Sequence, residues 1–163
     1  MNKIIYLAGG CFWGVQEYYS RLKGVISTIS GYANGIKENP TYLEVRSGNT
    51  LHAETVEVVY NPDIITLEKI LEHYLRFVDP YSINRQGEDV GNQYRTGIYF
   101  VDLEDEKVIK KFLDENLNVG YKIEIKKLDS FFKAEEYHQD YLKKNPDGYC
   151  HINLNLIRKN EKK

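Results

Sequence analysis

The sequence predicts an α+β fold, a two-layer sandwich of helices packed on a mixed sheet. The chain has 163 residues, which is close to the usual size of one domain. Its apolar residues recur every second position in some segments and every third or fourth position in others, as in strands and amphipathic helices. These segments follow one another as strand, helix, strand, strand, helix, strand, the order of a ferredoxin-like split βαβ unit. We therefore expect a ferredoxin-like core, followed by an additional helix and strand and an irregular C-terminal tail.

Glycines and alternating apolar residues delimit the elements of the first half. Gly9 and Gly10 end a run of β-forming residues, and Gly24 ends a segment with apolar residues at helical spacing. In two further segments apolar residues alternate with polar ones, and the second of these segments ends at a proline-containing turn. The elements expected in this half are a strand over 3–8, a helix from 12 to the Gly24 stop, a strand over 25–33, a long loop over 34–49 and a strand over 54–60.

In the second half, Thr66 can cap a helix, because its hydroxyl is able to accept a bond from a free amide of the first turn. Little periodicity is left after Gly148. The elements expected here are a helix after Thr66, a polar loop over 79–93, a strand over 96–101, a helix over 103–117, a strand over 121–128 and a helix over 134–144. We expect a single catalytic domain over 1–163, with a folded core over 1–145 and an irregular tail over 146–163 that carries Cys150.

Composition and charge exclude several classes of protein. The formal net charge is −2, which gives no strong attraction to nucleic acid or to an anionic membrane. No apolar stretch approaches the roughly 20 residues of a membrane span, and the apolar run after Lys3 is too short for a signal peptide. The cytoplasm is thus the expected compartment, where cysteines are kept as thiols. The two cysteines and four histidines lack C-x-x-C and H-E-x-x-H spacings, so we expect no metal site.

Cys11 lies where the first strand gives way to the first helix, directly after Gly9 and Gly10. Free amides and the positive end of the helix dipole point at such a position, and both favour the thiolate, which is the nucleophilic form of cysteine. Phe12 and Trp13 follow at once and suit an apolar pocket for a small methyl-like group. From position alone, a buried and inert cysteine among core aromatics explains these residues equally well.

Several segments of the chain resemble, in sequence and in order, those of one known family. They are Gly10–Gly14, Gly31–Gly35, Asn39–Tyr42, His52–Glu54, Gln86–Arg95, Ala134–Gln139 and Asn145–Cys150. The five-residue string Gly-Cys-Phe-Trp-Gly is fairly specific, and the ordered set is very specific. The chain therefore resembles the peptide methionine sulfoxide reductases of the A type.

The resemblance implies an oxidation and reduction cycle that uses both cysteines. Cys11 resembles the residue that attacks the sulfoxide sulfur and becomes a sulfenic acid, while Phe12 and Trp13 resemble the walls that hold the ε-methyl group. Cys150 resembles the resolving cysteine, which condenses with the sulfenic acid to a Cys11–Cys150 disulfide. The weak periodicity around Cys150 is typical of a segment mobile enough to reach the site, with a packed tail cysteine as the alternative.

The resemblance also implies the acid–base residues. Glu54 resembles the acid that protonates the sulfoxide oxygen, Tyr42 and Tyr94 the hydroxyl donors beside it, and Asp89 a partner that orients the site and the substrate. A carboxyl group is ionised at neutral pH unless it is partly desolvated, so Glu54 needs a buried position. Judged alone, Glu54 would be an exposed strand-edge charge, the tyrosines surface turn residues and Asp89 a turn residue.

Some members of this family carry a third cysteine in a glycine-rich tail, but here His151 and three further non-cysteine residues follow Cys150. A two-step disulfide relay is therefore excluded, and the reductant would be thioredoxin, or dithiothreitol in vitro. The resemblance implies a peptide-methionine (S)-S-oxide reductase that repairs oxidised proteins and also accepts peptides and free methionine sulfoxide. We expect a monomer without a bound cofactor.

Two other functions fit the residues. A cysteine hydrolase or acyl transferase would pair Cys11 with His52 or His138 as base, and would need no thiol reductant. A redox-sensing binding domain would use Cys11 and Cys150 as a switch, and would form a disulfide without turning over a sulfoxide. Reduction of methionine sulfoxide in the presence of dithiothreitol separates both from the reductase.

Overall fold

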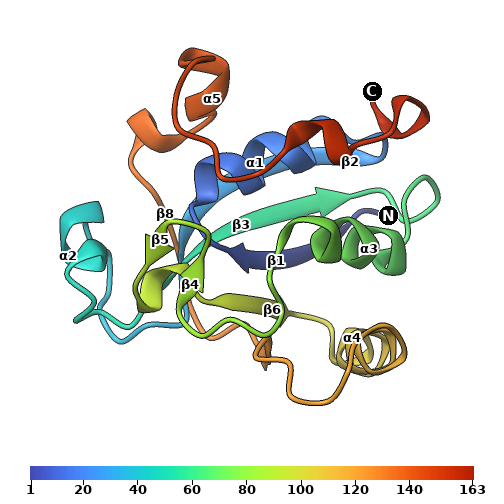
Figure 1. Ribbon diagram of the computed structural model, residues 1–163, viewed down its shortest axis with the longest axis horizontal. Helices are drawn as coiled ribbons and strands as arrows, with labels where there is room; N and C mark the ends of the chain where they lie inside the picture. Colours follow the sequence, from blue (N-terminus) through green and yellow to red (C-terminus); the bar gives the residue numbers. More distant parts are fainter.

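A computed structural model describes residues 1–163 and contains the expected core, in which helices cover one face of a mixed sheet (Figure 1). The core elements are β1 (Lys3–Gly9), α1 (Phe12–Ser20), β2 (Val25–Ala33), β3 (Ala53–Tyr60), α3 (Leu67–Phe77) and β6 (Thr96–Phe100). Their strands lie in the order β6-β1-β3-β2, all antiparallel to their neighbours, as in a ferredoxin-like unit. The predicted fold class is confirmed.

The remaining elements extend this core at both edges and over its surface. They are α2 (Tyr42–Arg46), β4 (Arg85–Gln86), β5 (Asp89–Val90), α4 (Leu103–Asn116), β7 (Glu124–Lys127), β8 (Phe131–Lys133), α5 (Tyr141–Lys144) and the 3₁₀ turns η1 (Asn92–Tyr94), η2 (Glu136–His138), η3 (Leu154–Leu156) and η4 (Lys159–Glu161). The predicted additional helix and strand are α4 and β7, and β7 pairs with β6 in parallel. β8 pairs with β2 and completes a sheet of six strands.

The core follows from the two-residue period of the strands. Along β1, Ile5 and Leu7 face the helices and join a cluster of 27 buried residues, whereas Tyr6 and Ala8 face the other way into a cluster of five. The helix side of the sheet therefore holds most of the apolar burial. None of the helices could span a membrane, because each is too short or too polar.

The helix expected over 134–144 is wrong. Its place is taken by η2 and the short α5, separated by Asp140, whose backbone is left-handed (φ 50°). The Gln139 side chain explains the interruption, because it accepts a hydrogen bond from the Ser30 amide at 3.0 Å and donates one to the Ser30 carbonyl at 2.8 Å. These bonds tie the segment to β2, and such tertiary contacts override local helical spacing.

Both long loops contain regular structure that was not predicted. The loop over 34–49 includes α2, which Thr41 and Glu44 open with a reciprocal capping box. The loop over 79–93 includes the β4–β5 hairpin and the start of η1. The strand expected over 121–128 is shorter and runs from Glu124 to Lys127.

The C-terminal tail is packed rather than loose. It contributes Ile152 and Ile157 to the main core cluster, and in Figure 1 it runs back along α1 before it ends near β2. Buried apolar side chains therefore flank the irregular stretch around Cys150, whereas residues 143–147 and Tyr149 within it are exposed.

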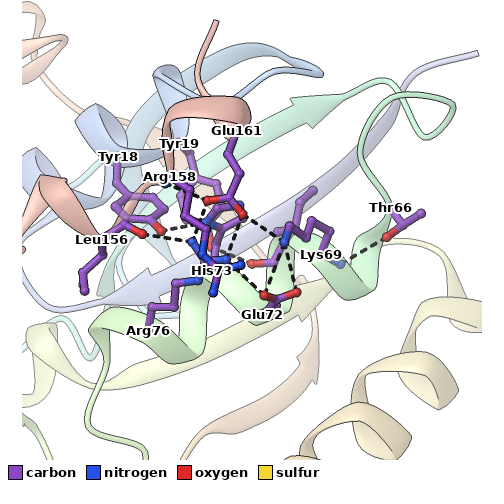
Figure 2. A network of polar contacts seen from close by, with 11 residues as sticks. Tyr18, Tyr19, Thr66, Lys69, Glu72, His73, Arg76, Leu156, Arg158 and Glu161 are labelled. Atoms are coloured by element: carbon purple, nitrogen blue, oxygen red, sulfur yellow. Dashed lines mark hydrogen bonds and ion pairs between the residues drawn. The ribbon is translucent and has the colours of Figure 1, made fainter.

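A polar network fastens the end of the tail to α3 (Figure 2). Glu161 accepts two hydrogen bonds from the Arg76 guanidinium, both at 2.8 Å, and pairs with Lys69 at 2.9 Å. These partners, with Arg76 first, lower the pKa of Glu161. His73 lies under this network, where it pairs through Nδ1 with the Tyr18 hydroxyl at 2.7 Å, and burial lowers its pKa to about 4. The bidentate pair to Arg76 is the geometry in which a carboxylate is held most firmly.

Candidate active site

The site is built around the junction between β1 and α1. Cys11 is the residue that precedes α1, and its side chain makes no capping bond to the helix. The thiol is buried, with 8% of the residue exposed. The first free amides of α1 are therefore available to groups other than the cysteine itself.

Glu54 on β3 uses one of these amides. Its Oε1 accepts a hydrogen bond from the Phe12 amide at 3.1 Å, which places the carboxyl group beside Cys11. Only 2% of Glu54 is exposed. Burial raises the pKa of Glu54 to about 8, opposed by the Phe12 hydrogen bond and assisted by the negative charge of Asp89. At neutral pH this carboxyl group therefore carries a proton.

In the resting protein, burial outweighs the influence of the helix start, which was expected to favour the thiolate of Cys11. Burial raises the pKa of Cys11 well above its usual value, and the charge of Glu54 acts in the same direction. The Trp13 amide acts in the opposite direction and lowers the pKa of Cys11, as expected at a helix start, but its effect is outweighed by burial. Both Cys11 and Glu54 are thus protonated before a substrate arrives.

Two tyrosine hydroxyls lie near this pair. Tyr42 is the first residue of α2, and its amide is held by the Glu135 carboxylate at 2.8 Å. Tyr94 ends η1, and its side chain lies close enough to that of Tyr42 to lower the pKa of the Tyr42 hydroxyl. Burial, followed by the charge of Glu54, raises the pKa of both tyrosines, so both hydroxyls remain donors. The structure therefore brings Tyr42 and Tyr94 together with Glu54 and Cys11.

Asp89 reaches the site from β5, in the hairpin that sequence patterns alone left as a loop. Its Oδ2 accepts a hydrogen bond from the Tyr149 hydroxyl at 3.0 Å, which joins the hairpin to the tail. The charge of Asp89 raises the pKa values of Cys11 and Glu54. Asp89 is therefore close enough to influence both groups through its charge.

An aromatic wall stands beside Cys11. Phe12 is buried, and Trp13 is stacked on Tyr141 with ring centres 3.6 Å apart and ring planes only 6° from parallel. The Trp13 indole also donates a hydrogen bond to His138 Nδ1 at 2.9 Å. His138 packs against Phe12 and Tyr42 with ring centres 5.2 and 4.5 Å apart. The wall is thus fixed by both stacking and hydrogen bonding.

Sequence reasoning missed Tyr141 and Tyr149 as members of this site, and it considered His138 only as a hydrolase base, not as a partner of Trp13. His138 and Tyr141 lie in the segment that was expected to be a regular helix, where they would face solvent or core rather than Trp13. The signal that could have found them is the clustering of aromatic residues and histidine just before the second cysteine. Tyr149 directly precedes Cys150 and could have been noticed for that reason.

Cys150 is half-buried and, like Cys11, a free thiol. Its Sγ donates a hydrogen bond to the Ile152 carbonyl oxygen at 3.3 Å. A methyl group on Gly14 would lie only 3.2 Å from Cys150 Sγ, so the glycine lets the tail pack directly on α1, one turn after Cys11. The two cysteines are therefore on neighbouring elements although 138 residues stand between them in the sequence.

The histidine bases of a cysteine hydrolase are absent from this arrangement. His52 accepts a bond from the Gly35 amide at Nδ1 and pairs with the Lys37 carbonyl through Nε2, so both ring nitrogens are occupied. His138 receives the Trp13 indole, as described above. Neither ring makes a hydrogen bond to Cys11. No group of three or more His, Cys, Asp or Glu residues could hold a metal ion.

Comparison with known proteins points to one family. A family model described as peptide methionine sulfoxide reductase matches residues 3–163. Peptide methionine sulfoxide reductase MsrA of Ureaplasma urealyticum serovar 10 is 53% identical over 162 residues, which is 98% of each chain. The protein of the same name from Lachnoclostridium phytofermentans is 55% identical over 155 residues, which is 93% of each chain.

Solved structures agree with these relatives. Mxr1 from Saccharomyces cerevisiae in its reduced form superposes with a TM-score of 0.85 at 36% identity, over 93% of this chain and 91% of that one. A structure of Mxr1 in complex with Trx2 aligns with a TM-score of 0.57 at 24% identity, over 86% of this chain and 84% of that one.

Proposed function

Since this chain belongs to the peptide methionine sulfoxide reductase family, we propose that Cys11 is the nucleophile with which it reduces methionine sulfoxide to methionine. The enzyme is an oxidoreductase that carries out this reduction by thiol chemistry. The observation that carries the assignment of residues is the buried, protonated Glu54, bonded to the first amide of the helix that Cys11 precedes. A nucleophile and an acid that meet in one dry site are what this reaction needs.

The proposed reduction transfers one oxygen atom. The substrate methyl group lies against Phe12 and Trp13, and Cys11 attacks the sulfoxide sulfur. Glu54 gives its proton to the sulfoxide oxygen and receives the proton that Cys11 loses. The sulfur–oxygen bond of the substrate breaks and the oxygen bonds to the Cys11 sulfur as the bond between the two sulfurs breaks. Methionine leaves, and Cys11 becomes a sulfenic acid.

Tyr42 and Tyr94 assist this step as hydrogen-bond donors. Their raised pKa values keep the protons on both hydroxyls, so both can donate to the sulfoxide oxygen while its negative charge grows. Asp89 orients the tail through Tyr149 and helps Glu54 to keep its proton.

We propose that Cys150 then resolves the sulfenic acid as a Cys11–Cys150 disulfide, which thioredoxin reduces. The complex of Mxr1 with Trx2 supports this choice of reductant. The substrates are oxidised proteins, peptides and free methionine sulfoxide. We propose that the enzyme acts as a monomer in the cytoplasm, which suits thiols that must be reduced after each turnover.

The function is tested by incubating the protein with dithiothreitol and the two resolved epimers of methionine sulfoxide. We expect the S epimer to be converted to methionine and the R epimer to remain, because separate enzymes handle the two epimers. Chromatography of free methionine gives the result directly. Conversion of neither epimer would contradict the function, and conversion of the R epimer alone would contradict the assigned type.

Replacing Cys150 with serine should separate the two halves of the cycle. One equivalent of methionine should still form per enzyme, because the attack needs only Cys11, but recycling by thioredoxin should fail for lack of a disulfide. Dithiothreitol, a small thiol, should restore slow turnover. Mass spectrometry after one equivalent of substrate should show a loss of about 2 Da for the wild type and a gain of about 16 Da for the variant.

This prediction has a clear contrary outcome. If Cys150→Ser recycles with thioredoxin as fast as the wild type, Cys150 is only a tail residue, and Cys11 is reduced without an internal partner.

A further inference from the structure

His151 holds the segment that carries Cys150 against the start of α1. Its Nε2 lies 2.8 Å from the Gly9 carbonyl, which can only accept, so Nε2 is the nitrogen that carries the hydrogen. A methyl group on Gly10 would come within 2.8 Å of the same nitrogen, and the backbone of Gly10 has φ +86°. The ring thus occupies the space beside the glycines that precede Cys11.

The other ring nitrogen is left without a partner. His151 Nδ1 is buried and makes no hydrogen bond. Since Nε2 carries the hydrogen of the neutral ring, Nδ1 presents a free lone pair. A buried acceptor without a donor is costly, and its retention calls for a reason.

The free lone pair lies close to the thiol of the neighbouring residue. A methyl group on Gly14 would lie 3.3 Å from His151 Nδ1 and 3.2 Å from Cys150 Sγ, so both atoms border the same small space on α1. The Cys150 thiol at present donates to a backbone carbonyl. Rotation about its Cα–Cβ bond is enough to turn the thiol hydrogen away from that carbonyl.

We propose that His151 is the base for the resolution step, taking the proton of Cys150 as this thiol attacks the oxidised Cys11. The proposal rests on the proposed function, because it needs a sulfenic acid on Cys11. The Cys150 sulfur–hydrogen bond breaks and its proton moves to His151 Nδ1. A sulfur–sulfur bond forms while the sulfur–oxygen bond of Cys11 breaks, and the departing hydroxide takes the proton from His151 and leaves as water.

The step is balanced without any outside reagent. The Cys150 sulfur is oxidised and the Cys11 sulfur is reduced, and His151 ends in the form in which it began. A base is needed here because burial raises the pKa of Cys150, so that the thiol does not ionise readily at neutral pH. Burial likewise lowers the pKa of His151, which leaves the imidazole neutral and able to accept a proton.

Few charged groups face this ring. On β4, the neutral side chain of Gln86 lies beside Gly10, as the His151 ring does. On β5, the carboxylate of Asp89 raises the pKa of His151, against the effect of burial. The Tyr149 hydroxyl binds that carboxylate, and the ring's own segment adds the Cys150 thiol. Asp89 therefore stabilises the imidazolium that exists briefly during the step.

The test compares His151→Gln with His151→Leu in single turnovers that are quenched by alkylation of free thiols. Gln keeps a donor for the Gly9 carbonyl but has no basic nitrogen, whereas Leu loses both. Mass spectrometry separates the sulfenic acid from the disulfide. We expect His151→Gln to form the disulfide roughly 100-fold more slowly at neutral pH, the lower end of what a general base supplies. The burst of methionine, which precedes the step, serves as the measure of folding.

The pH profile shows whether His151 acts as a base or only holds the Cys150 segment in place. In the wild type, the rate of disulfide formation should rise as pH passes the lowered pKa of His151 and then stay level through neutrality. In His151→Gln it should instead climb above neutrality, towards the raised pKa of Cys150. If His151→Gln keeps the wild-type rate and profile while His151→Leu is slow, His151 is only an anchor and the proposal is overturned.

Two further outcomes are decisive. If neither variant folds, the pH profile of the wild type decides. A rate of disulfide formation that rises only above neutrality, as a thiol ionises, overturns the proposal, whereas a rise below neutrality supports it. If the wild type itself gives no methionine burst, the proposed function fails. A normal burst with no effect of His151→Gln refutes the inference alone.

Discussion

Replacing Cys11 with serine is expected to abolish the reduction of methionine sulfoxide. The hydroxyl group fills nearly the same buried space before α1, so the fold and the aromatic wall should persist. A serine hydroxyl is weakly nucleophilic without an adjacent base, and no histidine is bonded to this position to supply one. Because the oxygen must be transferred to this atom, no other group in the site can substitute for the sulfur.

The measurement is formation of methionine with enzyme in excess over substrate, so that a single turnover per molecule is detected. Cys150→Ser serves as the matched control, since it removes the only other thiol and should keep the burst. Turnover of Cys11→Ser close to that of the wild type would overturn the mechanism, because the oxygen would then have another acceptor.

Replacing Glu54 with glutamine is expected to slow the reductive step by roughly 100- to 10,000-fold, the usual range for general acid catalysis. The amide oxygen can still accept the Phe12 amide hydrogen, so the local structure is kept, but the side chain has no proton to give. Glu57→Gln is a matched control on the same strand, because Glu57 faces the other side of the sheet and binds Tyr6. The single-turnover rate of Glu57→Gln should equal that of the wild type.

The pH dependence adds an independent check. The pKa of Glu54 is raised to about 8, so its proton is present below that pH and is lost as the pH rises through it. The wild-type reductive rate should therefore fall above about pH 8 for want of the acid, and Glu54→Gln should lack this fall. A single-turnover rate that is unchanged by the substitution, with the same fall at high pH, would remove Glu54 from the role of acid.

The core of the fold could be predicted because its signals are local. Gly24 lies in the turn that separates α1 from β2, Thr66 caps α3, and β3 forms where apolar residues alternate along the sequence. The segment after residue 134 could not be predicted, since its shape depends on bonds from Gln139 to a strand more than 100 residues earlier. The capping box of α2, in contrast, was visible as Thr41 and Glu44 three residues apart, and its omission was avoidable.

The sequence predicted which residues lie close together better than it predicted their electrostatics. Chemistry alone required a desolvated acid, and Glu54 is indeed buried. The protonation of Cys11 could not be predicted, because the helix dipole can be inferred from the sequence, whereas the burial of Cys11 and its closeness to Glu54 cannot. His151 escaped notice for the same reason, since its unpartnered nitrogen exists only once the tail lies on α1.

The fastening of the tail to α3 has a kinetic consequence. With Glu161 held by Arg76 and Lys69, residues 152–161 cannot drift from the enzyme, so Cys150 is confined to a small volume around the start of α1. A tethered group of this kind acts at an effective concentration that can exceed that of any dissolved thiol. In the proposed cycle, a newly formed sulfenic acid on Cys11 therefore meets Cys150 before it meets a second oxidant. The anchored tail would then protect Cys11 from the sulfinic state, which thioredoxin does not reverse.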